Sequence, residues 1–235
     1  MSENTQEQED MSPYIVNIKT VQSGAIRILV EALKEILTDT NIIFDETGVK
    51  LIATDNSHSV LIHMRLLADK FEHYHCPQKT VIGVNMNNMY KLLKVMVNND
   101  ILSIFIEKKE PNKIGFKINN IDKNSQTIFK MNLLDISDEE IVVPPVSFET
   151  ELTFPSAEFQ KLVRDMTNIG ELIDIKSVGN NLMLNCEGDY ATQETVLSET
   201  QDGLHFSLSS KPETPIQGTF SLKYLLLFTK CTNLC

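Results

Sequence analysis

The usual signatures of catalysis are missing from this sequence of 235 residues. It contains no glycine-rich phosphate loop, no nucleophile elbow and no paired-carboxylate signature. Asp165, next to Arg164, is more typical of a charged helix surface than of a general acid. Asp55 and His58 lie in a turn without a recognisable Ser or Cys nucleophile. We therefore expect a protein that is not an enzyme and that uses no cofactor.

Disulfide, metal and membrane signatures are missing as well. The cysteines have no Cys-x-x-Cys spacing and follow no signal-peptide pattern, which predicts a reduced intracellular protein; they are Cys76, Cys186, Cys231 and Cys235. No apolar run approaches the ~20 residues of a membrane-spanning helix. His73 and His75 would share one face of a strand, but no further ligands occur at matching spacing, so we predict no metal site.

Positive charge is the minority charge. The chain has 21 Lys and Arg against 32 Asp and Glu, a net charge of −11, which taken alone argues against binding to nucleic acid. Residues 2–10 contain only Ser, Glu, Asn, Thr, Gln and Asp, a composition typical of disorder. We expect a disordered acidic tail over residues 1–13.

An internal duplication organises the rest of the chain. Residues 134–148 contain a Pro-Pro pair and several carboxylates, which predicts an extended connector. On either side of it a helix opens, at Ser23, which can cap its helix, and at Ser156, an offset of 133 residues. The same offset aligns a hairpin at 42–51 with one at 175–184. We predict two similar α+β domains, 14–133 and 149–235, each with two helices packed on antiparallel sheets.

Hydrophobic periodicity places the individual elements. Helices are expected from Ser23, with an apolar stripe reaching Leu37, and over 85–96, 156–167 and 222–229. Alternation predicts strands over 14–19, 41–45, 49–54, 60–66, 101–107, 113–119, 127–133, 172–176, 182–186, 195–199 and 205–209.

Each expected helix carries two cations on one side. The spacings are three or seven residues, which place both members of a pair on the same helix face; the pairs are Arg27 and Lys34, Lys91 and Lys94, Lys161 and Arg164, and Lys223 and Lys230. Such side chains usually cover a solvated face opposite the core. The competing interpretation is a positive surface that faces a polyanion.

The sequence closely resembles the eukaryotic sliding clamps, the proliferating cell nuclear antigen family, from about Ile15 to the last residue. The resemblance is carried by Glu31-Ala-Leu-Lys34, Gly48-Val49, Asp55-Asn-Ser-His58, Gly83-Val-Asn85, Lys91-Leu-Leu-Lys94, Leu133-Leu-Asp135, Pro155-Ser156-Ala-Glu-Phe159, Arg164-Asp165, Ile169-Gly170, Tyr224-Leu and Phe228-Thr-Lys230. It implies a homotrimeric ring that encircles duplex DNA as a DNA polymerase processivity factor, with helices lining the hole. It also implies a location in the nucleus or in a viral replication compartment.

The resemblance assigns roles to residues. The eight helical cations match positions that face duplex DNA, although Ile28 and Asn168 stand where relatives often carry a lysine and a histidine. DNA polymerase, the clamp loader and other proteins with short hydrophobic-aromatic motifs would dock in a pocket formed by His58, Val60, Leu61, Ile141, Val142, Val143 and Pro144. That patch is equally compatible with ordinary core and loop packing. Subunits would join through strands 127–133 and 195–199, with the apolar candidates Phe129, Met131, Val196 and Leu197.

One departure from the family pattern is large. The segment 101–133 follows the second helix of the first half, whereas five residues follow Lys230 in the second half. We therefore expect about three strands of the family fold to be missing at the C-terminus. Two alternatives to a DNA-encircling homotrimer stay open: a protein-binding scaffold without encirclement, and one subunit of a heterotrimeric, checkpoint-type clamp.

Overall fold

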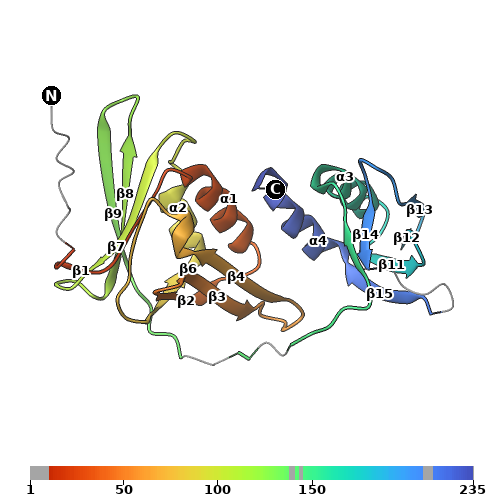
Figure 1. Cartoon of the computed structure of the whole chain (residues 1–235), viewed down its shortest axis with the longest axis horizontal. Coiled ribbons are helices and arrows are strands. Elements are labelled where there is room, and N and C mark those ends of the chain that lie inside the picture. Colours follow the sequence, from red (N-terminus) through yellow and green to blue (C-terminus); the bar gives the residue numbers. More distant parts are fainter. Residues whose placement is uncertain (1–10, 138–140, 143–144, 209–213, 235) are drawn as a thin grey trace. The chain divides into compact units, whose positions relative to one another are not determined.

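The structure is a computed structural model that describes residues 11–137, 141–142, 145–208 and 214–234. The chain divides into two compact units, Met1–Ile141 and Val142–Cys235, here called unit 1 and unit 2 (Figure 1).

Unit 1 contains two antiparallel sheets. One has the order β5-β1-β7-β8-β9, with bounds His73–His75, Tyr14–Thr20, Ile101–Glu107, Lys113–Asn120 and Ser125–Asn132. The other has the order β4-β3-β2-β6, with bounds Leu61–Leu67, Gly48–Thr54, Asp39–Asp45 and Thr80–Asn85. A short 3-10 helix, η1 (Ala68–Lys70), links β4 to β5. The predicted alternation in β4 is confirmed, since Ile62 is buried while Leu61 and His63 are exposed.

Helices α1 (Ser23–Leu33) and α2 (Met86–Leu93) pack against each other in unit 1 (Figure 1). Asn85 caps α2, because its side-chain oxygen accepts a hydrogen bond of 2.9 Å from the Asn88 amide. Ser23 does not cap α1: the N-cap is Gln22, and the Ser23 hydroxyl donates to the Val97 carbonyl at 3.2 Å. That bond ties the start of α1 to the loop after α2.

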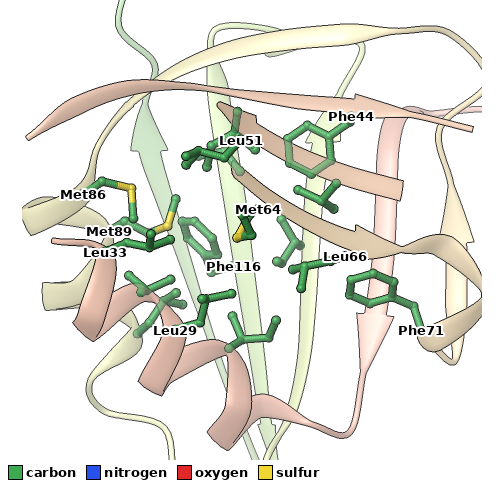
Figure 2. Close-up of a pocket in the computed structure, with 17 residues that line it drawn as sticks. Leu29, Leu33, Phe44, Leu51, Met64, Leu66, Phe71, Met86, Met89 and Phe116 are labelled. Atoms are coloured by element: carbon green, nitrogen blue, oxygen red, sulfur yellow. The ribbon is translucent and has the colours of Figure 1, made fainter. Parts of the chain in front are cut away.

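Apolar side chains from both helices and both sheets form the core of unit 1. Phe116, Leu51 and Met86 are at most 1% exposed. A cavity of about 60 Å³ remains among them, lined only by apolar residues, and Figure 2 shows Met64, Met89 and Phe116 around it. The thioethers are flexible side chains that pack well in such irregular spaces.

Unit 2 repeats part of this plan. Its larger sheet has the order β13-β12-β11-β15, with bounds Thr192–Ser198, Asn181–Glu187, Leu172–Val178 and Ile216–Ser221. A two-stranded sheet pairs β10 (Glu151–Thr153) with β14 (His205–Leu208). Helices α3 (Ser156–Thr167) and α4 (Leu222–Phe228) pack together, and the 3-10 helix η2 (Thr229–Leu234) follows.

The four-stranded sheets of the two units share one strand order, and the predicted α+β architecture of two similar domains is confirmed. The offset of 133 residues relates α1, β2 and β3 to the starts of α3, β11 and β12. At β6 and β15 the offset has grown to 136 residues. Gly83, opposite Asn41, therefore corresponds to Thr219, opposite Asp174.

Some elements differ from the expectation. Helix α2 ends at Leu93, three residues before the predicted end, and α4 passes into 3-10 winding after Phe228. Strands β6 and β15 were not predicted: each contains a glycine and runs directly into a helix, so its alternation is short. Strands β5 and β10 have three residues each, too few for a period to show.

Candidate nucleic-acid interface and docking site

Helix α1 carries two of the predicted DNA-facing cations, and both have partners inside unit 1. The half-buried Arg27 donates from Nη2 to the Asn98 side-chain oxygen at 3.4 Å. Lys34 is the C-cap of α1, where a cation is favourable next to the negative end of the helix dipole. Its Nζ lies 2.6 Å from a Glu35 carboxylate oxygen and 4.7 Å from the centroid of the Tyr90 ring. The charge of Lys34 is thus already engaged.

Helix α2 presents its cations more openly. Lys91 is exposed, and its Nζ lies 3.5 Å from the Asn88 side-chain oxygen. Lys94 is exposed at the C-cap. Of the four candidates in unit 1, this pair is the better placed to contact a phosphate.

In unit 2, Lys161 and Arg164 are exposed one turn apart on α3. Lys223 is exposed on α4, with its Nζ 5.7 Å from the Tyr224 ring centroid. Lys230 lies on η2 and not on α4. Winding that changes from α to 3-10 after Phe228 still brings the seven-residue spacing close to two full turns, so a shared face for Lys223 and Lys230 stays a prediction.

The loop after β3 is built around a buried carboxylate. One oxygen of Asp55 accepts hydrogen bonds of 2.8 Å from the amides of Ser59 and Val60, and the other accepts from the amide and hydroxyl of Ser57. The Asp55 side chain thereby folds the chain back on itself, and His58 takes a positive φ of 54° at the tip. The His58 Nδ1 lies 3.0 Å from the Thr54 hydroxyl. This loop presents His58 in a fixed position beside β4.

The structure brings together three of the seven predicted pocket residues. His58 is exposed at the loop tip, Val60 packs against the core, and Leu61 at the start of β4 is 42% exposed. Ile141 is half-buried in unit 1, and Val142 in unit 2 is 77% exposed. Val143 and Pro144 lie outside the described residues.

The connector begins as an addition to a sheet. The Leu134 amide donates to the Gly83 carbonyl at 2.8 Å, and the two residues form an isolated antiparallel bridge. Since β6 is the last strand in its sheet, residue 134 lies at the free edge of that sheet.

The predicted subunit-contact strands are both sheet edges. β9 ends the five-stranded sheet and β13 ends the four-stranded sheet of unit 2. Phe129, Met131 and Leu197 pack against the cores, whereas Val196 is 51% exposed. Ile128, 50% exposed on the outer side of β9, was missed, although the alternation with Phe129 was there to indicate it.

An ion-pair network braces the β9 edge. Lys130 Nζ lies 2.7 Å from a Glu107 oxygen and 2.5 Å from a Glu110 oxygen, and Lys113 Nζ lies 2.8 Å from Glu110. Hydrogen bonds from Lys113 and then Lys130 lower the pKa of Glu110 to about 2. The hydrogen bond from Lys130 also lowers the pKa of Glu107.

Comparison with known proteins identifies the family. The model of the proliferating cell nuclear antigen N-terminal domain matches residues 15–140, and the model of its C-terminal domain matches residues 142–235. The chain belongs to the proliferating cell nuclear antigen family. It is 34% identical over 224 residues to "Probable DNA polymerase sliding clamp 1" of Paramecium bursaria Chlorella virus 1, covering 94% of this chain and 84% of that protein. It is 28% identical over 219 residues to "Proliferating cell nuclear antigen" of Chaetomium thermophilum, covering 91% and 83%.

The family match divides the candidate sites between its two domains. The Asp55 loop, the Gly83 bridge and the β9 edge lie in the part matched by the N-terminal domain, while β13, α3 and α4 lie in the C-terminal part.

His73 and His75 lie on β5, opposite Lys19 and Asn17 of β1. Among the described residues, no group of three or more His, Cys, Asp or Glu could hold a metal ion. Within the same residues, every helix falls short of the length and apolar character that crossing a membrane requires.

Proposed function

We propose that three copies of this chain join head to tail into a ring that encircles duplex DNA and keeps a DNA polymerase on its template. The observation that carries the proposal is the family match over both units, with a relative named as a DNA polymerase sliding clamp. The free edges of β9 and β13 support it, since a strand from each could pair across a subunit boundary. Such a clamp acts without catalysis, in the nucleus or a viral replication compartment.

The proposed DNA contact is a mobile one. A closed ring retains DNA by topology, so its inner face needs only phosphate contacts that are independent of sequence and weakened by salt. Exposed cations on the helices meet that need although the net charge of the chain is −11. Acidic residues elsewhere would repel DNA from the rest of the surface and leave the positive helical surface as the place of contact. Lys91, Lys94, Lys161 and Arg164 are the strongest candidates for the contact, because each pair is exposed three residues apart at the end of α2 or on α3.

The proposed docking site for the polymerase, the clamp loader and other partners is the Asp55 loop with the connector. Partner segments that fold as a short amphipathic helix bury apolar anchors in a groove. Leu61 supplies exposed apolar surface beside His58. The family resemblance adds the connector residues Ile141, Val142, Val143 and Pro144 to this proposed site.

Solution mass and DNA retention test the clamp. A trimer at micromolar concentration is expected, and Val196→Asp, at an exposed position on β13, should shift it toward monomer, since it would bury an unpaired charge against the neighbouring subunit. After loading, a topological ring stays on circular DNA at salt that strips phosphate contacts and slides off linear DNA. A monomeric wild type that binds partners would favour the scaffold function. A trimer lost equally from both DNA forms would contradict encirclement.

A further inference from the structure

One edge of strand β10 is open in unit 2, although the matching edge is paired in unit 1. Leu152 of β10 lies opposite Phe206 of β14. In the same arrangement, Ile18 of β1 lies opposite Tyr74 of β5, and on its other side it lies opposite Ile104 of β7. Within the described part of unit 2, β10 pairs with β14 alone. The backbone groups along its second edge are therefore left for another strand.

An apolar groove of about 210 Å³ lies beside β10, lined among others by Leu152, Ile175 and Phe220. Phe220 is the counterpart of Val84, because β15 pairs with β11 in the same register as β6 pairs with β2. Phe220 is 48% exposed, whereas Val84 is completely buried. Ile175 is likewise half-buried, although its counterpart Ile42 belongs to the core of unit 1. The same sheet positions are thus covered in unit 1 and partly open to solvent in unit 2.

Unit 1 shows what kind of segment covers these positions. Leu102 and Ile106 of β7 are at most 1% exposed, and they lie in one core cluster with Val84 and Ile42. Apolar residues at every second position of an extended strand thus provide the cover. β7 itself is held between β1 and β8, so a strand that covers the groove of unit 2 comes from elsewhere.

Polar groups beside the groove add to this description. Among the described residues, the Thr150 hydroxyl oxygen lines the groove and is buried without a hydrogen-bond partner, which an added strand would supply. The exposed Glu151 alternates with Leu152, and the exposed Glu149 precedes it, so this edge is acidic. A Lys or Arg opposite Glu151 is a favourable cross-strand pair.

We propose that unit 2 binds an extended segment of another protein, in which apolar residues alternate with Lys or Arg, by strand addition at the free edge of β10. The backbone of the segment hydrogen-bonds to β10, its apolar residues fill the groove, and its cations lie on the side of Glu151. The site does not depend on the proposed clamp function, because its residues and its test are separate from those of the ring.

Peptide binding to the full chain is the first test. The probe is a heptapeptide with Leu, Ile and Ile at the second, fourth and sixth positions, as in β7, and Lys at the others; a scrambled peptide is the control. We expect saturable binding of the alternating peptide and slower hydrogen exchange of the amides of residues 151–153 in its presence. Two further peptides are N-methylated at alternate amides, in the two possible sets. Since one set of amides faces β10 and the other faces away, one of these peptides should bind and the other should not.

Substitutions at exposed positions test the same contact from the protein side. Phe220→Ala removes apolar lining and should weaken the alternating peptide about tenfold. Phe228→Ala is the matched control, because Phe228 is 44% exposed on α4 and does not line the groove. Glu151→Lys should weaken this peptide about threefold and strengthen, by a similar factor, a peptide that carries Glu in place of Lys.

The outcomes that would overturn the proposal are distinct. A wild type that does not bind the alternating peptide, or binds the scrambled one equally, would remove the site. Equal binding of both methylated peptides, or unchanged affinity in Phe220→Ala, would overturn strand addition in the groove. Association of the chain with itself that excludes the peptide would assign the groove to a second copy instead. The solution mass and DNA retention of the proposed ring are measured independently of these results.

Discussion

Each unit has a four-stranded sheet and two helices, but the apolar face of that sheet is covered differently in the two units. In unit 1, β1 pairs with β7, and β8 and β9 extend the same sheet over the core. In the described part of unit 2, β10 has the single partner β14. An apolar groove of about 210 Å³ remains there, lined among others by Leu152, Ile175 and Phe220, and Phe220 is 48% exposed. Equivalent sequence patterns thus give a closed core in one unit and a partly open one in the other.

The outer faces of the same two sheets also differ. Asp55 and its loop connect β3 to β4 in unit 1, whereas a short turn closed by the Gly188 amide and the Ala191 carbonyl at 3.0 Å connects β12 to β13 in unit 2. The residue equivalent to Gly83 of β6 is Thr219 of β15, which carries a polar side chain. The Asp55 loop proposed for docking thus has no counterpart in unit 2, which predicts one docking site per chain despite the duplication.

The largest expected effect concerns the two cores. Since burial of apolar surface dominates stability, strands β11 and β12 should exchange their amides sooner than β2 and β3. Phe116→Ala, at a site 1% exposed, should destabilise unit 1 by about 3–5 kcal/mol and reverse that order. Residue-resolved hydrogen exchange in increasing urea measures the order in which these strands lose protection. The matched Leu184→Ala should act on unit 2 alone, and a Phe116→Ala chain in which β2 and β3 still outlast β11 and β12 would contradict the comparison.

A smaller effect is expected for the loop that only unit 1 has. Asp55→Ala leaves the Ser59 and Val60 amides without their acceptor, at a cost of about 1–3 kcal/mol. We expect faster hydrogen exchange at the amides of residues 57–60 and weaker binding of a designed amphipathic peptide that carries Leu and Phe at i and i+4. Exchange of the amides of unit 2 should not change. Ser57→Ala is the control, because it removes one hydroxyl donor and keeps all three amide hydrogen bonds to Asp55. Equal peptide affinity for Asp55→Ala and wild type would show that the loop does not shape the docking site.

Local patterns predicted what depends on neighbours in the chain. Helix α3 spans the predicted residues, because Pro155 bounds an amphipathic stripe that ends by Thr167. The apolar alternation of β4 also fixed which side chains are buried. The family resemblance then supplied the architecture and the candidate sites.

Contacts between distant residues escaped prediction. The engagement of Lys34 with Tyr90 and the bridge of Gly83 to Leu134 join residues more than fifty positions apart, and no spacing rule addresses them. The end of α4 was predicted one residue too late, because winding there changes from α to 3-10 after Phe228, which propensity does not specify. The exposure of Ile128 on β9 was likewise not predicted, because the apolar alternation of an edge strand does not say which of its faces another element covers.

A third prediction concerns acid, which should lower the stability of the β2–β3 hairpin in unit 1 but not that of the β11–β12 hairpin in unit 2. Hydrogen bonds from Lys50 and then Thr47 lower the pKa of Asp45 from 3.8 to about 2. Because the folded-state pKa is the lower one, the stabilisation is present above pH 3.8 and is lost as pH falls toward 2. Unit 2 has Val178 and Met183 at the equivalent positions of the β11–β12 hairpin, so it lacks this dependence. Lys50→Met should reduce the acid sensitivity of β2–β3 exchange, by about 1 kcal/mol or less between pH 4 and pH 2. An unchanged profile would mean that the pair contributes nothing.

The smallest expected effects are changes in DNA affinity on removal of helical cations. Each phosphate contact contributes about 0.9 to the slope of log affinity against log salt, so the double variants Lys91→Ala/Lys94→Ala and Lys161→Ala/Arg164→Ala should each flatten that slope by roughly two. Equal changes would show that both units face DNA, whereas a change in only one variant would assign the contact to that unit.

Lys34→Ala sharpens the comparison, because its cation is already held by Glu35 and Tyr90 and its side chain is 17% exposed. We expect its salt slope to stay within experimental error of wild type, with a small loss of α1 stability from the lost ring contact. Lys94→Ala, at the matching C-cap of α2, should lower the slope by about one contact. If Lys34→Ala flattens the slope as much as Lys94→Ala does, then Lys34 leaves Glu35 and Tyr90 when DNA is present, and the α1 face contributes to the contact as fully as α2.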